Sequence, residues 1–321
     1  MTAALRTWTI GVAFLVGGVA PTAGQIVARS TYVSDGSFEL PPPGPTSPRE
    51  PNAIAVGPDG SIHIVDQRGQ VMVFEATGTP RRSYGSGLLR KPLNVDIDEN
   101  GKAYVLDGDL KQVKVFDGEG SELYAIGGAR QGPAQLDDPV GLALGPSGFV
   151  YVLDKGDAVV RVFGRDGVFV RQLALGPDVR NAVGIAVGGD GRIFIVDRAG
   201  GPQVFSFPPF SDVAWASGTG PETIPLGPVE EAAAVAVDGF GTAVVLDRKQ
   251  GRIWGGSRLD PSTATQDRPL YGGIGRGRGS FREPVGLAFT PERHLVVLDR
   301  ELRKVERVEL TEGGEARELV W

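Results

Sequence analysis

Cysteine does not occur among the 321 residues of the sequence. Its absence excludes a disulfide framework, thiolate metal sites and a cysteine nucleophile. Histidine is almost as scarce, because the sequence contains only His63 and His294. Two histidines give no basis for a histidine-rich zinc site or a Ser-His-Asp triad. A surplus of basic residues is also missing, and the net charge of −6 argues against nucleic acid as a partner, since phosphate binding needs a concentrated basic surface.

Long apolar runs are limited to one segment near the N-terminus. Residues 8–20 carry no charge, Arg6 precedes them, and the small residues of 21–24 follow them. This order is typical of a secretory signal peptide, and the run is shorter than the about 20 residues that span a membrane. We therefore expect residues 1–24 to be a signal peptide and the mature protein to be secreted or periplasmic, without stable membrane insertion. The excess of 26 arginines over 7 lysines is typical of a GC-rich bacterial genome.

Glycine and proline, in contrast, are abundant, with 48 and 24 residues. This composition favours short strands joined by tight turns and disfavours long helices. Residues 25–50 are expected to form an N-terminal strand, at 26–33, followed by a proline-rich linker. Residues 51–321 are organised by an internal repeat.

The repeat is a short apolar run that ends in aspartate and recurs six times at spacings of 41 to 52 residues. Its aspartates are Asp66, Asp107, Asp154, Asp197, Asp247 and Asp299. Each copy follows a first apolar run and a turn, and is followed by a third run and a weaker fourth one. The fourth runs include VAWASG at 213–218 and ARELVW at 316–321. The pattern predicts an all-β fold, a six-bladed β-propeller with four antiparallel strands per blade and blades that start near 51, 92, 139, 182, 232 and 284.

Two details of the repeats resemble a known family. The inner strands open with Pro-Val-Gly-Leu-Ala at 139–143 and 284–288, and several second strands end in Val-Leu-Asp. The segment 272–284 carries a Gly-x-Gly-x-Phe-x-x-Pro linker, which we interpret as an interblade connection because a strand, and no helix, follows it. The repeats resemble those of the NHL-like and TolB-like six-bladed propellers. The resemblance implies the fold, and related propellers include metal-dependent lactonases and an amidating lyase, so it leaves the function open.

A candidate ring of polar residues occupies the position before each inner strand. Its members are Glu50, Lys91, Asp138, Asn181, Glu231 and Glu283. These positions should surround one mouth of the central channel. The oxygen-rich set suits Ca²⁺, another divalent cation or a cationic ligand. The alternative is that the carboxylates pair with the arginines that directly precede four of these positions, Arg49, Arg90, Arg180 and Arg282.

A second candidate lies inside the channel. The inner strands carry glycine or alanine on one face, but blade 2 has Asn94 and Asp96 there. Strand alternation puts both residues on the same face. They form either an oxygen-donor pair that faces the channel or a satisfied polar network. The candidate site at the channel mouth is therefore Glu50, Asn94, Asp96, Asp138, Asn181, Glu231 and Glu283.

Several other polar and aromatic residues receive structural interpretations. The six repeat aspartates occupy equivalent strand ends, which indicates a shared role in accepting backbone N–H groups. His63 occupies a position filled by Tyr104 and Tyr151 in the next two repeats, so we expect it to pack in the core. Three aromatic residues are candidates either for a binding patch or for core packing: Phe210, Trp215 and Trp254.

These observations predict a monomeric binding or scaffolding module for a protein, peptide or glycan partner. The long loops at 127–138, 206–231 and 255–283 would contact that partner. The alternative is a lactonase-like, divalent-metal-dependent hydrolase or lyase with its site at the channel mouth. An enzyme predicts that Asn94, Asp96 and a carboxylate of the ring converge, whereas a binding module predicts those groups in ion pairs.

Closure of the ring also has two solutions. Blade 6 takes its outer strand either from 316–321 or from the N-terminal strand.

Overall fold

The computed structural model describes residues 31–44, 47–128, 132–199, 201–209, 220–224, 226–238, 241–257 and 270–311. The expected signal peptide of residues 1–24 lies outside the described residues, as do the candidates Phe210 and Trp215. Every regular element in the described part is a β-strand, and no helix there is long and apolar enough to cross a membrane.

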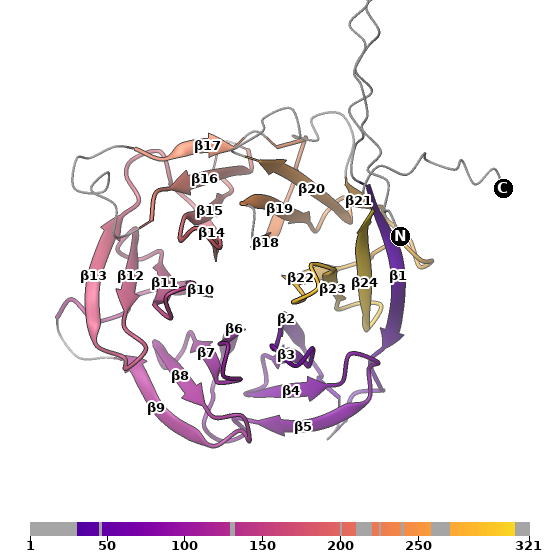
Figure 1. Cartoon of the computed structure of the whole chain (residues 1–321), viewed down its shortest axis with the longest axis horizontal. Coiled ribbons are helices and arrows are strands. Elements are labelled where there is room, and N and C mark those ends of the chain that lie inside the picture. The colour runs from indigo at the N-terminus through magenta and orange to yellow at the C-terminus, as the bar shows by residue number, and fades with distance from the viewer. Residues whose placement is uncertain are drawn as a thin grey trace, which may run out of the picture.

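Six four-stranded antiparallel sheets surround a central channel and form a six-bladed propeller (Figure 1). Blade 1 contains β2 (Pro51–Val56), β3 (Ile62–Asp66), β4 (Gln70–Phe74) and β5 (Pro80–Tyr84). Blade 2 contains β6 (Pro92–Ile97), β7 (Ala103–Asp107), β8 (Gln112–Phe116) and β9 (Glu122–Gly127). Blade 3 contains β10 (Pro139–Leu144), β11 (Val150–Asp154), β12 (Val159–Phe163) and β13 (Phe169–Ala174).

The other three blades repeat this order from the channel outward. Blade 4 contains β14 (Ala182–Val187), β15 (Ile193–Asp197), β16 (Gln203–Phe207) and β17 (Glu222–Ile224). Blade 5 contains β18 (Ala232–Val237), β19 (Thr242–Asp247), β20 (Arg252–Ser257) and the short β21 (Tyr271–Gly272). Blade 6 contains β22 (Pro284–Phe289), β23 (Leu295–Asp299), β24 (Lys304–Thr311) and β1 (Thr31–Glu39).

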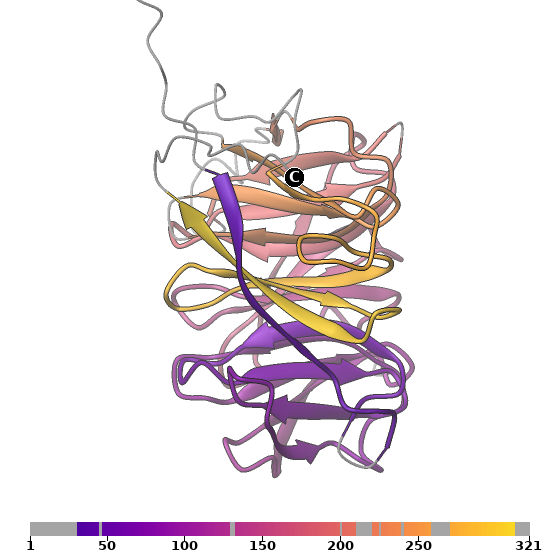
Figure 2. The same cartoon turned by 90° about the vertical axis from the view of Figure 1, so that its right-hand side faces the viewer.

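The N-terminal strand closes the ring. β1 pairs antiparallel with β24 from Thr31 opposite Thr311 to Glu39 opposite Lys304, so it is the outer strand of blade 6 (Figure 2). Of the two closures that the sequence permits, the structure has the one that joins the two ends of the chain in one sheet. The segment 316–321 lies outside the described residues. The fourth strand of blade 4 is β17, which pairs with β16 from Glu222 to Ile224. The segment 213–218, which the sequence suggests for this strand, lies outside the described residues.

The hydrophobic core is divided among the interfaces between blades. Each of six clusters takes its buried side chains from two neighbouring blades. The cluster between blades 6 and 1 includes Leu298 and Val285 from one side and Ile64 and Phe74 from the other. A blade buries its two faces only against its neighbours, so the ring is stable as a closed unit.

The repeat aspartates hold each blade at one end of the channel. Asp107, for example, is fully buried and accepts the backbone N–H groups of Arg90, Lys91, Asp109 and Leu110 at 2.6 to 3.1 Å. The other five aspartates bind the segment before their own inner strand in the same way. This agrees with the structural role that the sequence predicts for all six. The Asp also lies opposite the first residue of the inner strand, so both sit at the same end of the channel.

Candidate functional site

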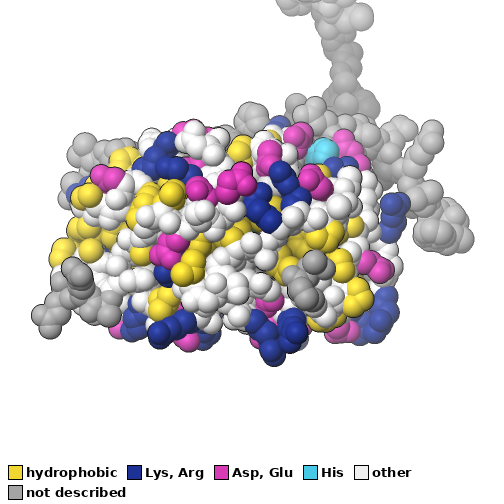
Figure 3. Space-filling model, turned by 90° about the horizontal axis from the view of Figure 1, so that it is seen from below, with side chains coloured by type: hydrophobic (Ala, Val, Ile, Leu, Met, Phe, Trp, Pro, Cys, Tyr) yellow, Lys and Arg dark blue, Asp and Glu magenta, His cyan; other side chains and the backbone are white. Residues whose placement is uncertain are grey.

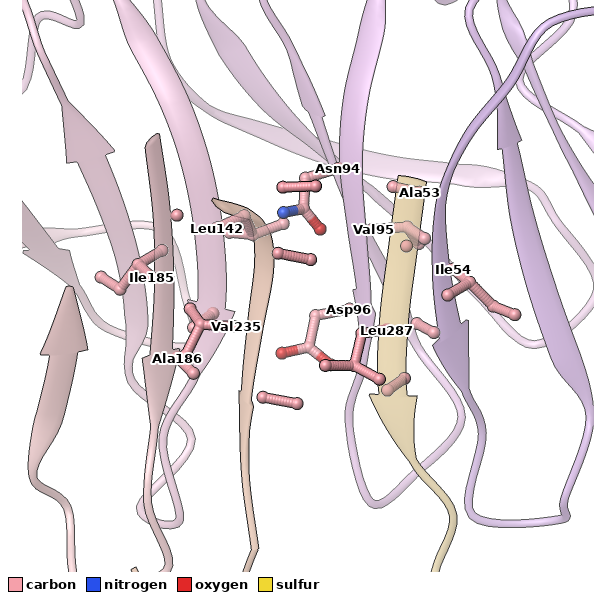
Figure 4. A pocket seen from close by; sticks show the side chains of 18 of the residues that line it. Ala53, Ile54, Asn94, Val95, Asp96, Leu142, Ile185, Ala186, Val235 and Leu287 are labelled. Atoms are coloured by element: carbon pink, nitrogen blue, oxygen red, sulfur yellow. The ribbon is translucent and has the colours of Figure 1, made fainter. Parts of the chain in front are cut away.

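The central channel contains a cavity with a volume of about 600 Å³. Its wall consists mainly of alanine, valine, leucine and isoleucine side chains from the six inner strands (Figure 4). The polar and charged side chains that line it are few: Asn52, Asn94, Asp96, Lys155, Arg198 and Arg248. The volume lies in the range of about 300–1,000 Å³ that ligand pockets occupy.

Small residues in the wall have a geometric reason. A side chain at the third position of an inner strand points at the next blade, and a Cβ at Gly141 would lie 2.9 Å from Ile185 Cγ2. The same distance separates a Cβ at Gly286 from Ile54 Cγ2. Asn94 holds this position in blade 2, and Figure 4 shows its amide directed into the cavity near Leu142. Within the described residues, the Asn94 amide has no hydrogen-bond partner, so a donor and an acceptor face the channel.

Asp96 lies two residues further along the same strand and is satisfied by backbone groups. One carboxylate oxygen accepts the N–H of Ile97 at 2.9 Å, and the other accepts the N–H of Leu144 in blade 3 at 2.8 Å. Burial raises the pKa of Asp96 to about 6, and the nearby charge of Asp98 adds to this, against the two backbone hydrogen bonds. The carboxyl therefore links blade 2 to β10, the inner strand of blade 3, through the backbone N–H of Leu144.

The charged mouth is the end of the channel at which the inner strands begin. The position before each inner strand and the position just after each repeat aspartate meet there, because their backbones are hydrogen-bonded, as in Arg248 N–H to Glu231 O at 2.9 Å. Figure 3 shows charged side chains along both rims of the propeller, with apolar side chains between them on the flank.

In three blades, ion pairs neutralise the charged mouth, and we name the residues of these pairs the paired arc. Glu50 pairs with Arg68 at 2.9 Å in blade 1, Glu231 pairs with Arg248 in blade 5, and Glu283 pairs with Arg300 in blade 6. The Arg300 guanidinium donates to both oxygens of Glu283 and holds the pKa of that carboxyl below its usual range. The arginines follow the repeat aspartates and are not those that precede the ring positions.

The other three blades form what we name the open arc: Lys91, Asp138, Lys155 and Arg198. In the part of the chain that the structure describes, no ion pair involves any of these four side chains. Asn181 stands in blade 4 where blades 5 and 6 have glutamate. The open arc thus holds three cations against one carboxylate.

Arg198 is the most enclosed cation of the open arc. Its Nε donates to the carbonyl oxygen of Ala232 at 2.6 Å, so the side chain reaches from blade 4 to the neighbouring blade 5. Burial lowers the pKa of Arg198; the charge of Glu231 opposes this shift and that of Arg248 adds to it. Arg198 and Lys155 both line the cavity, whereas the ring carboxylates do not.

The residues present do not fit a divalent cation. Within the described ranges, no group of three or more histidine, aspartate or glutamate side chains lies together in a metal-binding arrangement. Asp96 already accepts two backbone N–H groups, and three of the ring carboxylates are in ion pairs. The charge nearest the cavity at the mouth is also positive. The oxygen-rich ring expected from the sequence therefore does not converge on the channel.

His63 and Trp254 occupy the core. His63 is 3% exposed, and its ring nitrogens lie 3.1 Å from Ser61 Oγ and 3.1 Å from the Tyr84 hydroxyl. Burial lowers its pKa to about 4. Trp254 is 1% exposed and packs between blades 4 and 5, so it belongs to the core and not to a binding patch. His294 lies directly before β23, and its Nδ1 is 3.5 Å from Asp35 Oδ2.

The Gly-rich segment before blade 6 is an interblade connection. Buried Lys304 donates to the carbonyl oxygen of Ser280 at 2.8 Å, and buried Glu306 accepts the N–H of Gly279 at 2.7 Å. Glu306 also accepts the hydroxyl of Tyr271 at 2.5 Å. These bonds fix the segment to β24.

Comparisons with known proteins support the fold and leave the activity open. No protein-family model matches the chain. The human NHL-repeat-containing protein 4 is 25% identical over 113 residues, which cover 34% of this chain and 87% of that protein. The chain resembles NHL-repeat proteins in sequence.

Solved structures show the same architecture. A gluconolactonase from Xanthomonas campestris matches with a TM-score of 0.61 at 13% identity, over 90% of this chain and 94% of the other. A virginiamycin B lyase from Staphylococcus aureus matches with a TM-score of 0.59 at 14% identity, over 88% of this chain and 100% of the other. At these identities the likeness concerns the fold alone. The chain is thus a six-bladed propeller with NHL-like repeats.

Sequence reasoning missed the three cations that line the cavity of this NHL-like propeller. Lys155, Arg198 and Arg248 directly follow a repeat aspartate, and a charged residue recurs there in four of the six blades. That recurrence was the available signal. It carries a cation into the mouth because the backbone at this position bonds to the segment before the inner strand.

Proposed function

We propose that the protein is an exported binding module that holds a protein, peptide or glycan partner at the charged mouth of its channel. The observation that carries this proposal is the open arc above a cavity of about 600 Å³ with an apolar wall. Unpaired charge next to apolar surface is a feature of binding sites. Charged groups elsewhere on a protein surface are usually solvated or paired, and their ion pairs contribute little free energy. Propellers also present a rigid face made of loops from every blade.

The ion pairs of the paired arc support a binding role over catalysis. Carboxylates that are engaged with arginine are poor metal ligands and poor general bases, because their negative charge is already stabilised. The three loops that the sequence assigns to a partner end at the charged mouth with Asp138, Glu231 and Glu283. Residues 129–131, 210–219, 225 and 258–269 of those loops lie outside the described residues.

Two matched double variants test the proposal. Lys155→Glu with Arg198→Glu reverses the charge at the mouth, and Arg165→Glu with Arg192→Glu reverses two cations on the loops at the opposite end. The immobilised full chain is offered the secreted proteins and glycans of its own source. We expect a ligand that the wild type and the opposite-end variant retain and the mouth variant loses. Equal retention by all three proteins contradicts a site at the mouth.

Export has its own test, because it rests on the sequence alone. Cells that produce the full chain are fractionated, and the N-terminus of the product is sequenced. We expect the protein outside the cytoplasm with Gln25 as its first residue. A product that keeps residues 1–24 and stays inside the cells contradicts export.

A divalent-metal-dependent hydrolase or lyase is the second candidate. The lactonase and the lyase among the structural neighbours favour it as a likeness of fold. Thermal unfolding of the full chain with Ca²⁺ and Zn²⁺ decides, with Asp96→Ala as the variant. A rise in Tm that vanishes in the variant supports a metal site in the channel, and no shift at millimolar metal counts against this candidate.

A further inference from the structure

We infer that the charged mouth binds the C-terminal carboxylate of an extended peptide whose aliphatic side chains enter the channel. This inference rests on the proposed binding function and names the chemistry of its partner. It follows from three features of the channel and its mouth: the open arc, the Asn94 amide and the apolar wall.

The first feature is an arc of cations with spare donors. Arg198 lines the cavity and uses its Nε for Ala232 O, and its two terminal nitrogens have no hydrogen bond in the described residues. Lys155 Nζ likewise has no partner there. Arginine presents paired N–H groups in the geometry that a carboxylate matches, and burial makes such a bond stronger. Asp138 and Glu231 are the negative charges nearby, and Glu231 is engaged by Arg248.

The second feature lies below the arc. Asn94 offers both an N–H donor and a carbonyl acceptor to the cavity (Figure 4). A peptide group needs this combination, whereas a carboxylate alone needs donors only. Asn94 is on β6 of blade 2, and Lys155 and Arg198 come from the two blades that follow, so the three residues belong to one half of the channel.

The third feature, the apolar wall, determines which part of a ligand fits inside the cavity. Beyond Asn94, the carboxylate oxygens of Asp96 already accept two backbone N–H groups, and the rest of the wall consists mainly of apolar side chains such as Val187 and Phe289. The apolar side chains offer no hydrogen bonds to the hydroxyls of a sugar, whose burial without partners is costly. Aliphatic side chains lose no hydrogen bond on entering such a cavity. A peptide end with small aliphatic residues therefore fits the wall better than an acidic sugar does.

The test compares acetyl-Ala-Val-Ala-Val as the free acid with its C-terminal amide by isothermal titration calorimetry on the full chain. We expect the amide to bind at least about tenfold more weakly, because it cannot accept charge-assisted hydrogen bonds from Arg198 and Lys155. Octanoate carries the same carboxylate and an aliphatic body without peptide groups. We expect it to bind more weakly than the peptide acid, and tighter binding of octanoate would overturn a peptide as the source of the carboxylate.

Two variants within the mouth sharpen the test and leave the fold in place. Asn181→Glu gives blade 4 the glutamate that pairs with arginine in blades 5 and 6, so it should occupy Arg198 and weaken the peptide acid about tenfold. Glu231→Gln releases Arg248 toward the cavity and should tighten binding. Both variants are checked for a Tm that stays close to that of the wild type.

Failure of this inference differs from failure of the proposed function. Equal binding of acid and amide, or no binding of either, overturns the carboxylate assignment. The proposed function fails instead when charge reversal at the mouth leaves retention of the natural partner unchanged.

Discussion

Blades 1, 5 and 6 close their part of the charged mouth with carboxylate–arginine pairs, whereas blades 2, 3 and 4 leave Lys91, Asp138, Lys155 and Arg198 without one in the described residues. The backbone frame is the same in both halves, since each repeat aspartate binds the segment before its inner strand. The repeat therefore specifies positions around the channel, and the residue types at those positions specify what each half can bind. The polar residues of β6 lie in the open half.

The largest effect should come from the frame that both halves share. Asp107→Ala in the open half and Asp299→Ala in the paired half each remove a fully buried carboxylate and leave several backbone N–H groups without an acceptor. We expect each variant to lose about 4 kcal/mol of unfolding free energy in urea. Asp117→Ala, at an exposed turn, is the control. A loss in only one half would show that the frame is not common to both.

This frame explains why the fold could be predicted from the sequence. The aspartates, the turns and the Pro-Val-Gly-Leu-Ala openings recur in phase, and each has a local physical cause in strand pairing or turn geometry. The outer strands of blades 4 and 6 could not be placed in the same way. β17 spans only Glu222–Ile224, and β1 pairs with a strand more than two hundred residues away, so neither leaves a local periodic signal.

The candidate site was harder to predict for a different reason. The sequence locates Glu50, Glu231 and Glu283 at the mouth but not the direction of their side chains. Their partners come from the neighbouring turn of the same blade, which brings an arginine beside each of them. Asn94 and Asp96 were found because they break the small-residue rule, yet only the hydrogen bond from Leu144 shows that Asp96 is satisfied while Asn94 is open.

The next largest effect is a pH dependence of the unfolding free energy that belongs to the paired half. His63, in blade 1, has a pKa lowered by burial to about 4 from 6.5, so the folded state favours the neutral ring. Its contribution to stability is full above pH 6.5 and is lost as the pH falls through 4, which amounts to about 3 kcal/mol at pH 4. His63→Phe should remove this loss. Urea unfolding from pH 7 to pH 4 measures it, and an equally steep fall in the variant would contradict the assignment.

A smaller pH effect of opposite sign belongs to the open half. Burial raises the pKa of Asp96 from 3.8 to about 6, so the folded state holds its proton more tightly than the unfolded state. The stabilisation is full below pH 3.8 and is lost as the pH rises through 6, by about 2 kcal/mol because the carboxyl is partly open to the channel. Asp96→Asn should flatten stability between pH 4 and pH 7, and Asp166→Asn, at an exposed turn, should not. A curve unchanged by Asp96→Asn would place the titration elsewhere.

The smallest effect comes from adding an ion pair to the open half and removing one from the paired half. Asn181→Glu adds the missing carboxylate beside Arg198, whose backbone N–H already binds Asn181 O at 3.1 Å as that of Arg248 binds Glu231 O. We expect a gain of about 0.5 kcal/mol, since partly exposed ion pairs contribute little, and Glu231→Gln should lose a similar amount. Both changes should shrink in concentrated salt, because screening weakens exposed pairs. A loss of stability in Asn181→Glu would contradict this expectation. It would show that Arg198 does not accept a new carboxylate partner, and that the two halves differ in geometry rather than in the number of unpaired charges.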